Sequence, residues 1–220
     1  MLSAVVASPE LWSIIGLSLA VSLCATTIAA LLGLPIGTAL AIWDFPGRRG
    51  IVVTCNALLG LPPAVVGLGL YLLLSRSGPL GGLRLLFTPA AMVIAQSVLA
   101  LPIVVALAHR AVEDLWEAFG DALMDLGASR WRAVPALIFM GRRHMLTAIL
   151  AGFGRTMSEV GAILVVGGNI ASYTRTMTTA IVLETSRGDL PLALGLGFVL
   201  IGLTLLISAA AFALAGRPTW

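Results

Sequence analysis

Two charged side chains in the middle of an apolar stretch are the residues best placed to do chemistry in this chain. Arg155 and Glu159 lie four positions apart between Met145 and Ile170. On a helix, that spacing puts a guanidinium and a carboxylate close enough to pair. A charge at the centre of a membrane helix costs roughly 3 kcal/mol, so both groups should face protein or water. They would either line the path of a substrate or form an ion pair that fixes helix register, and the sequence leaves both roles open.

The residue types present exclude several other kinds of chemistry. No nucleophile stands in a recognisable pattern with a base, so we expect no catalytic residue and no enzyme activity. His109 and His144 have no third ligand at metal-binding spacing, so we expect no metal site. The chain contains no lysine, which a phosphate-binding P-loop requires. We therefore expect no bound cofactor on this chain, and any ATP hydrolysis must belong to a separate one.

The composition is that of an integral membrane protein. Of the 220 residues, 59% are hydrophobic and only 10% are charged, and the mean hydropathy is +1.05. A soluble globular domain carries about 25% charged residues. The net charge of +3 does not indicate nucleic-acid binding, because the arginines are spread over the ends of apolar stretches. We expect a single transmembrane domain over residues 1–220 that contacts the lipid bilayer and no nucleic acid.

Five apolar stretches are long enough to cross a bilayer as helices. They are Leu11–Trp43, Ile51–Leu74, Pro89–Ala108, Met145–Ile170 and Leu190–Ala215. The expected fold class is therefore all-α, with about five transmembrane helices. Arginine is enriched in cytoplasmic loops, and an outside N-terminus leaves eight arginines in cytoplasmic segments against four outside. We expect a multi-pass protein of the cell membrane with its N-terminus outside and its C-terminus in the cytoplasm.

Prolines and small residues predict two local features of these helices. Pro62 and Pro63 should break the second stretch, since proline lacks a backbone donor and clashes with the preceding turn. In the fourth stretch, small residues recur at intervals of three and four, the spacing of a seam at which membrane helices pack closely. They are Ala151, Gly154, Ser158 and Gly161.

The longest polar segment, from His109 to His144, interrupts the apolar pattern. It holds five of the ten acidic residues and five of the thirteen arginines. We interpret it as two short helices joined at Gly127, because Ala128 and Ser129 then supply the turn and the cap of the second helix. A cytoplasmic segment of this length predicts a docking surface for a partner, and a solvated amphipathic loop is the simpler alternative.

This segment resembles the cytoplasmic EAA loop of ABC importer permeases, in which a glycine follows the glutamate by six residues. Here Asp121-Ala122-Leu123 takes the first position, Gly127 follows the aspartate by six, and Leu137-Ile138-Phe139-Met140 closes the pattern. Asp121, Leu123 and Met140 depart from the family's residues. The resemblance implies a coupling helix that fits a groove on a separate ATPase subunit. The residues that it assigns to coupling are Asp121, Ala122, Leu126, Gly127, Ala128, Ser129 and Trp131.

A second resemblance begins in the fourth apolar stretch. The run Ala151–Ala162 is similar to the segment after the coupling loop in permeases of molybdate and tungstate importers, and Arg175–Thr185 resembles the tungstate branch. The resemblance implies the type I ABC importer permease fold and a homodimer. It also implies two ATP-binding subunits beneath the dimer and an extracytoplasmic oxyanion-binding protein above it. The implied function is import of tungstate or molybdate by alternating access.

The candidate pathway or gate residues follow from the chemistry of such an anion. A tetrahedral dianion needs hydrogen-bond donors and positive potential, which Arg155 and Asn169 can supply. The full set of candidates is Arg155, Ser158, Glu159 and Asn169. Two other functions stay open, a self-sufficient secondary transporter or channel that uses Arg155 and Glu159, and a non-transporting membrane anchor.

Overall fold

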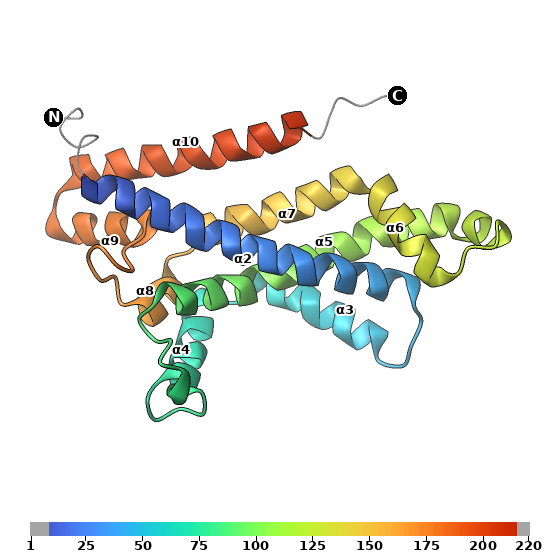
Figure 1. The fold of residues 1–220 in the computed structure, drawn as a ribbon, viewed down its shortest axis with the longest axis horizontal. Coiled ribbons are helices and arrows are strands. Elements are labelled where there is room, and N and C mark those ends of the chain that lie inside the picture. Colours follow the sequence, from blue (N-terminus) through green and yellow to red (C-terminus); the bar gives the residue numbers. More distant parts are fainter. Residues whose placement is uncertain (1–8, 215–220) are drawn as a thin grey trace.

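The computed structural model describes residues 9–214, in which every regular element is a helix (Figure 1). The sequence prediction of an all-α chain is thereby confirmed. The α-helices are α2 (Pro9–Ile42), α3 (Arg48–Ala57), α4 (Pro63–Leu74), α5 (Pro89–Asp125), α6 (Arg130–Met140), α7 (Arg142–Met157), α8 (Gly161–Gly167), α9 (Met177–Arg187) and α10 (Leu190–Leu214), and two short 3-10 helices are η1 (Leu58–Gly60) and η2 (Gly81–Leu83).

The long helices α2, α5, α7 and α10 run lengthwise and define the long axis of the molecule (Figure 1). α2 and α5 pack closely through glycine. A Cβ atom placed on Gly37 would lie 2.9 Å from the backbone nitrogen of His109, and one placed on Gly33 would lie 2.9 Å from the Cβ of Val104. Contacts this short have no room for a larger side chain, so small residues set the distance between the two helices.

Within residues 9–214, three helices are long and apolar enough to cross a membrane, namely Glu10–Ile42, Pro89–Asp125 and Leu190–Ala213. Two bent helix pairs raise the number of candidate spans to five if each pair counts as one span. That upper count equals the number of predicted stretches, although the second bent pair joins Arg130–Met140 to Arg142–Met157 and so begins before the predicted fourth stretch, Met145–Ile170. Only 11% of the apolar window in α10 is buried within the chain, so this helix offers most of its surface to lipid or to a partner. The predicted end of the fifth stretch, Ala215, lies outside the described residues.

The second span is broken where the sequence predicted. The segment Arg48–Gly60 meets Pro63–Leu74 at an angle of 105°. Pro63 is the first residue of α4, a position at which the missing N–H costs no helical hydrogen bond. α4 leaves the side of the bundle (Figure 1). It packs on α8 through Gly67, where an added Cβ would lie 2.8 Å from the Cα of Ala162.

The helix that contains the third predicted stretch, α5, is longer than the sequence predicted. The apolar stretch ends near Ala108, whereas α5 continues without a break to Asp125. The first half of the polar segment is therefore the end of α5, and the prediction of two separate short helices is wrong for the first of them. The segment after Ala108 contains no proline and is rich in alanine, leucine and glutamate, so nothing local ends the helix where the side chains become polar.

The fourth span is not the continuous helix that the sequence predicted between Met145 and Ile170. α7 already begins at Arg142 and ends at Met157, and α8 starts only at Gly161. α6 and α7 meet at 75° around Gly141. The predicted seam of small residues is also wrong as a single face, because the helix that should carry it is interrupted at Ser158.

Candidate functional site

The turn between α5 and α6 has the geometry predicted from its three residues. Gly127 adopts a left-handed backbone with φ of 80°, which glycine reaches without steric cost. The N–H of Ala128 donates to the carbonyl of Leu123 at 3.0 Å. The Oγ of Ser129 accepts from the backbone N–H of Arg132 at 3.4 Å and caps α6. The end of α5 and the whole of α6 thus form a hairpin, which we call the coupling hairpin (residues 117–140).

The residues assigned to coupling lie together at the tip of this hairpin. Asp121 and Ala122 are exposed on the last turns of α5, and Ala128 is half-buried in the turn. Leu126 is 85% exposed and Trp131 is 75% exposed. Large apolar side chains on such a polar tip are costly in water, so the tip has the character of a surface that a partner covers.

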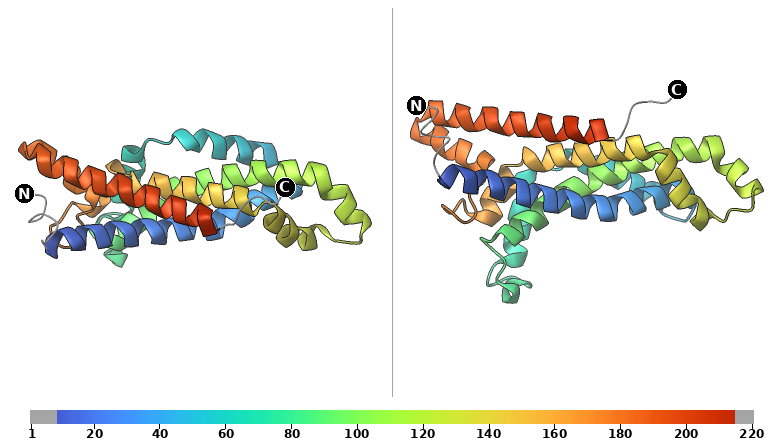
Figure 2. Two further views of the ribbon diagram at one scale, coloured as in Figure 1. Left: turned by 90° about the horizontal axis from the view of Figure 1, so that it is seen from above. Right: turned by 45° about the horizontal axis from the view of Figure 1, so that its top comes forward.

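The opposite face of α6 holds the hairpin on the bundle. Ala133 and Leu137 are fully buried against α2, α5 and α7. Trp131, although 75% exposed at the tip, also contacts this end of the bundle, since its ring centroid lies 4.6 Å from that of Trp43, the residue after α2. The hairpin sits at the end of the molecule far from α9 in every view (Figures 1 and 2). A force on its tip would therefore pass directly to the long helices.

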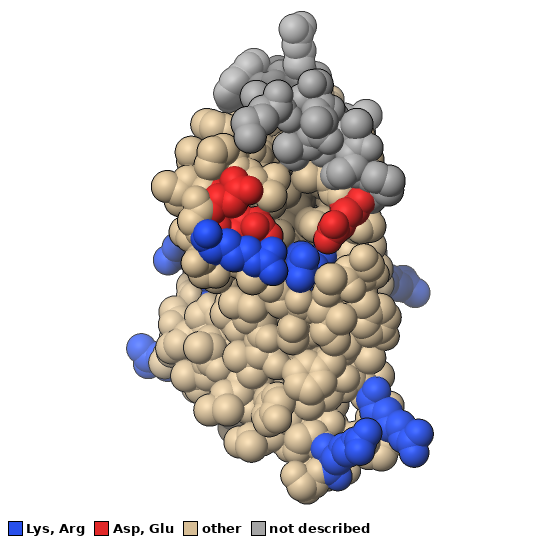
Figure 3. All heavy atoms as spheres, turned by 90° about the vertical axis from the view of Figure 1, so that its left-hand side faces the viewer, with Lys and Arg blue, Asp and Glu red and all other residues tan. Residues whose placement is uncertain are grey.

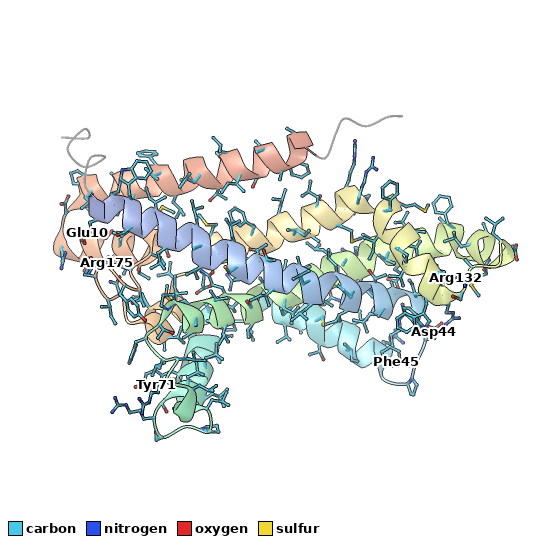
Figure 4. All side chains as sticks on the ribbon, in the orientation of Figure 1. Glu10, Asp44, Phe45, Tyr71, Arg132 and Arg175 are labelled. Carbon is cyan, nitrogen blue, oxygen red and sulfur yellow. The ribbon has the colours of Figure 1, made fainter. Side chains whose placement is uncertain are left out.

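Ion pairs brace the base of the hairpin. Arg48 at the start of α3 lies 2.9 Å from Glu113 on α5 and 3.1 Å from Asp44, which lies at this end of the molecule in Figure 4. The Nδ1 of His109 is 3.7 Å from the same Glu113. α3 is thereby tied to the part of α5 that leads into the coupling hairpin.

Glu159 occupies the break between α7 and α8. Its side chain is only 2% exposed, and its Oε1 accepts from the N–H of Ala162 at 2.9 Å. Its Oε2 lies 3.7 Å from an Nη atom of Arg155, so the two charges face each other as predicted. Its backbone carbonyl accepts from the hydroxyl of Thr178 on α9 at 2.8 Å. The carboxylate therefore accepts from one N–H group in the first turn of α8 and also pairs with a cation.

Arg155 and Ser158 complete this small site. The Arg155 side chain is 29% exposed, and Ser158 is exposed at the end of α7. A guanidinium that pairs on one side and is open on the other can still bind a passing anion. The contact with Glu159 and the 29% exposure of Arg155 are compatible with both roles of the pair, a structural ion pair and a lining of the path.

Asn169 does not belong to the same cluster. It follows α8 in a left-handed conformation with φ of 49°, and its Oδ1 is buried without a hydrogen-bond partner. The seven residues of α8 separate it from Glu159, a length of about 10 Å of helix. The four predicted pathway residues thus form a cluster of three and a separate turn.

The sequence did not predict the buried polar side chains that bind the end of α7, just before the break. Gln96 on α5 is 2% exposed and donates from Nε2 to the carbonyl of Thr156 at 2.9 Å. The hydroxyls of Thr26 and Thr156 lie 3.1 Å apart between α2 and α7. A glutamine within an otherwise apolar membrane stretch was the available signal for this buried cluster. Among residues 9–214, no three His, Cys, Asp or Glu side chains are placed to hold a metal ion.

Comparison with known proteins decides the family. No protein-family model matches the sequence. A probable anion ABC transporter permease protein from Haloferax volcanii is 41% identical over 202 residues, which cover 90% of this chain and 87% of the relative. The chain belongs to the ABC transporter permeases. The resemblance found in the sequence is confirmed, and the permease is accordingly a multi-pass membrane protein of an ABC transport system.

Two further relatives are named for particular anions. The permease is 36% identical to the tungstate uptake system permease protein TupB of Peptoclostridium acidaminophilum. The match extends over 206 residues, 94% of this chain and 90% of the relative. It is 33% identical over 172 residues to the molybdenum transport system permease protein ModB of Azotobacter vinelandii, which cover 70% of this chain and 74% of the relative.

Proposed function

We propose that this permease is the membrane-spanning subunit of an ATP-driven importer for a tetrahedral oxyanion, tungstate or molybdate. The observation that carries the proposal is the similarity to permeases named for tungstate and molybdenum transport. Arg155, whose side chain is 29% exposed at the break of the fourth span, supplies positive charge that an anion on this path would need. A permease must release its cargo, so the weak binding expected at a partly exposed arginine suits transit.

ATP hydrolysis takes place on a separate subunit that docks on the coupling hairpin. Leu126 and Trp131 present apolar surface at the tip, while Ala133 and Leu137 anchor the other side of the hairpin in the bundle. Closure of the ATPase dimer would push the hairpin and, through α5 and α7, move the broken fourth span. Transport then proceeds by alternating access between two copies of this chain.

The hairpin end of the molecule faces the cytoplasm and the α9 end faces outward. Most of the arginines lie at the hairpin end, as expected for cytoplasmic segments. At the other end, Arg175 pairs with Glu10 at 3.5 Å, and Figure 4 shows both residues beside α9. An extracytoplasmic oxyanion-binding protein would deliver the substrate at this outer end.

Transport by the assembled system tests the proposal. The permease is reconstituted into liposomes with its ATPase subunit and its binding protein, and uptake of radiolabelled molybdate and of tungstate is measured with ATP enclosed. We expect uptake that requires ATP, the ATPase and the loaded binding protein together. Uptake by the permease alone without ATP would instead favour a self-sufficient transporter and overturn the proposal.

A further inference from the structure

Two arginines line one cavity in the loop that follows α4. The cavity has a volume of about 650 Å³, and its walls include Tyr71, Arg76, Ser77, Arg84 and Phe87. This volume lies in the range of small-molecule sites, about 300–1,000 Å³. The residues belong to the segment that projects from the side of the bundle, where Figure 4 labels Tyr71.

The positive charge in this cavity is not compensated. Arg76 and Arg84 are both exposed, and neither forms an ion pair with a residue in the described part of the chain. No aspartate or glutamate lines the cavity. At the foot of Figure 3, where α4 and its loop project, basic side chains stand apart from the acidic ones. By contrast, Arg48, Arg155 and Arg175 each lie within 4 Å of a carboxylate.

The loop that carries the two arginines is folded tightly and is therefore able to hold them in place. The N–H of Gly78 donates to the carbonyl of Ser75 at 2.8 Å, and the N–H of Leu80 donates to that of Leu73 at 3.0 Å. A Cβ on Gly78 would collide with the carbonyl of Leu72, so the chain closes on itself here only because the residue is glycine.

Hydroxyl groups stand beside the guanidinium groups. The Oγ atoms of Ser75 and Ser77 lie 3.3 Å apart on the cavity wall. Arginine offers a planar fork of N–H donors that fits two oxygens of one oxyanion. The Ser75 hydroxyl donates to the carbonyl of Leu72 at 3.2 Å and can accept from Ser77, which leaves the Ser77 hydroxyl as the serine donor that can turn to a bound anion. This set of donors is suited to a tetrahedral oxyanion, and no carboxylate lines the cavity to attract a cation.

One wall of the cavity connects it with the turn after α8. The N–H of Phe87 donates to the carbonyl of Val166 at 2.8 Å, and a Cβ on Gly168 would lie 2.8 Å from the ring of Phe87. Asn169, the pathway candidate with the unpartnered buried Oδ1, is the next residue. An anion held by Arg76 and Arg84 would therefore rest beside a turn already assigned to the path.

We propose that Arg76 and Arg84, with Ser75 and Ser77, form a binding site for a tetrahedral oxyanion group on the permease itself. The chemistry fits a free inorganic oxyanion or the phosphate of an anionic lipid, which the exposed Leu72, Leu73 and Leu83 nearby would also favour. The inference rests on the proposed function for its choice of molybdate as the probe.

Direct binding to the full-length permease tests the site without the ATPase. The chain is placed in nanodiscs of phosphatidylcholine alone, and equilibrium binding of radiolabelled molybdate is measured. The variant replaces both arginines, Arg76→Gln with Arg84→Gln, and the matched control is Arg187→Gln, whose partner is Glu184. A charge-assisted hydrogen bond is worth roughly a factor of ten in affinity, so the double variant should bind at least about tenfold more weakly than the control.

A second arm separates the two sources of the oxyanion. Wild-type chain and both variants are extracted from membranes that contain phosphatidylglycerol, and the retained lipid is counted by native mass spectrometry. Loss of phosphatidylglycerol from the double variant alone supports the site with a lipid phosphate as its occupant. If the double variant matches the control in both arms, with equal gel-filtration profiles, the site is overturned. The proposed function is tested by a different experiment, and it fails if the assembled wild-type transporter shows no ATP-driven uptake.

Discussion

Removal of Arg155 should destabilise the fold more than removal of the whole Arg155–Glu159 pair. At 3.7 Å and an effective dielectric of about 20, the two charges attract by roughly 4–5 kcal/mol. Breaking a buried pair from one side costs about 3–5 kcal/mol. Because the Arg155 side chain is 29% exposed, we expect a loss near 2–3 kcal/mol for Arg155→Ala. This variant leaves the Glu159 carboxylate buried without its cation.

The double change with Glu159→Gln should recover most of that loss. A glutamine amide oxygen can still accept the 2.9 Å hydrogen bond from the N–H of Ala162, and no buried charge remains. We expect a net cost of about 1 kcal/mol for the double variant, in the range of one neutral hydrogen bond. The double variant then loses less stability than Arg155→Ala, which is the result expected if the pair stabilises the fold.

Equilibrium unfolding of the purified permease in mixed micelles, followed by circular dichroism, measures these differences. Arg187→Ala is the control, since the Arg187 side chain is 58% exposed and an ion pair of such an arginine should contribute less than about 1 kcal/mol. The reasoning is refuted if Arg155→Ala is no more harmful than this control, or if the double variant is less stable than Arg155→Ala. Equal loss of uptake in the single and double variants, at equal protein levels, would show that Arg155 also serves the path.

Three further substitutions test particular contacts. Gly67→Ala should destabilise the permease by about 1–3 kcal/mol because its Cβ meets Ala162, whereas Gly69→Ala on the same helix has open space and should be neutral or slightly stabilising in the same unfolding assay. Thr178→Val should cost about 1 kcal/mol through loss of the hydrogen bond to the Glu159 carbonyl, and Thr185→Val, at an exposed position, should cost less; equal losses would contradict the role of Thr178. Gly127→Pro cannot adopt the φ of 80° at the hairpin turn, so it should abolish stimulation of the ATPase by loaded binding protein while membrane insertion stays normal; retained stimulation would show that the turn is not needed.

Local chain chemistry accounts for the features that the sequence predicted correctly. Pro62 and Pro63 set the 105° bend because proline constrains the backbone whatever surrounds it. Gly127 and Ser129 set the hairpin turn for the same reason, since a left-handed glycine and a capping hydroxyl act within a few residues. The lengths of the apolar stretches predicted the three long helices that can cross a membrane, because the bilayer thickness is a fixed requirement.

The features that the sequence did not predict depend on contacts between distant segments. The break at Ser158–Val160 has no proline, and it is held by Thr178, which lies nineteen residues after Glu159 in the chain. The small-residue seam was misread for a related reason. A Cβ on Gly154 would meet nothing in the described chain, whereas one on Gly152 would lie 3.0 Å from Val104. Spacing alone cannot tell which glycine faces a neighbour.

The full length of α5 does not follow from its hydropathy, because a change from apolar to polar side chains does not by itself end a helix. α5 in fact runs on to Asp125 and carries its charged turns beyond the apolar part. This continuity is what makes the coupling hairpin a direct extension of a membrane helix. The residues assigned to coupling were found from the family resemblance, and their shared place at an exposed tip needed the structure.

Copurification of an ATP-hydrolysing subunit with this chain tests the central claim most directly. The wild-type permease and Leu126→Asp are isolated from native membranes under the same mild conditions, with Leu190→Asp at the other end of the molecule as the control. Leu126 is 85% exposed, so its replacement should leave the fold intact and place a charge on the docking surface. We predict that the wild-type and control chains carry the ATPase and that Leu126→Asp does not. An ATPase retained by Leu126→Asp, or absent from the wild-type chain, would contradict the role of the coupling hairpin.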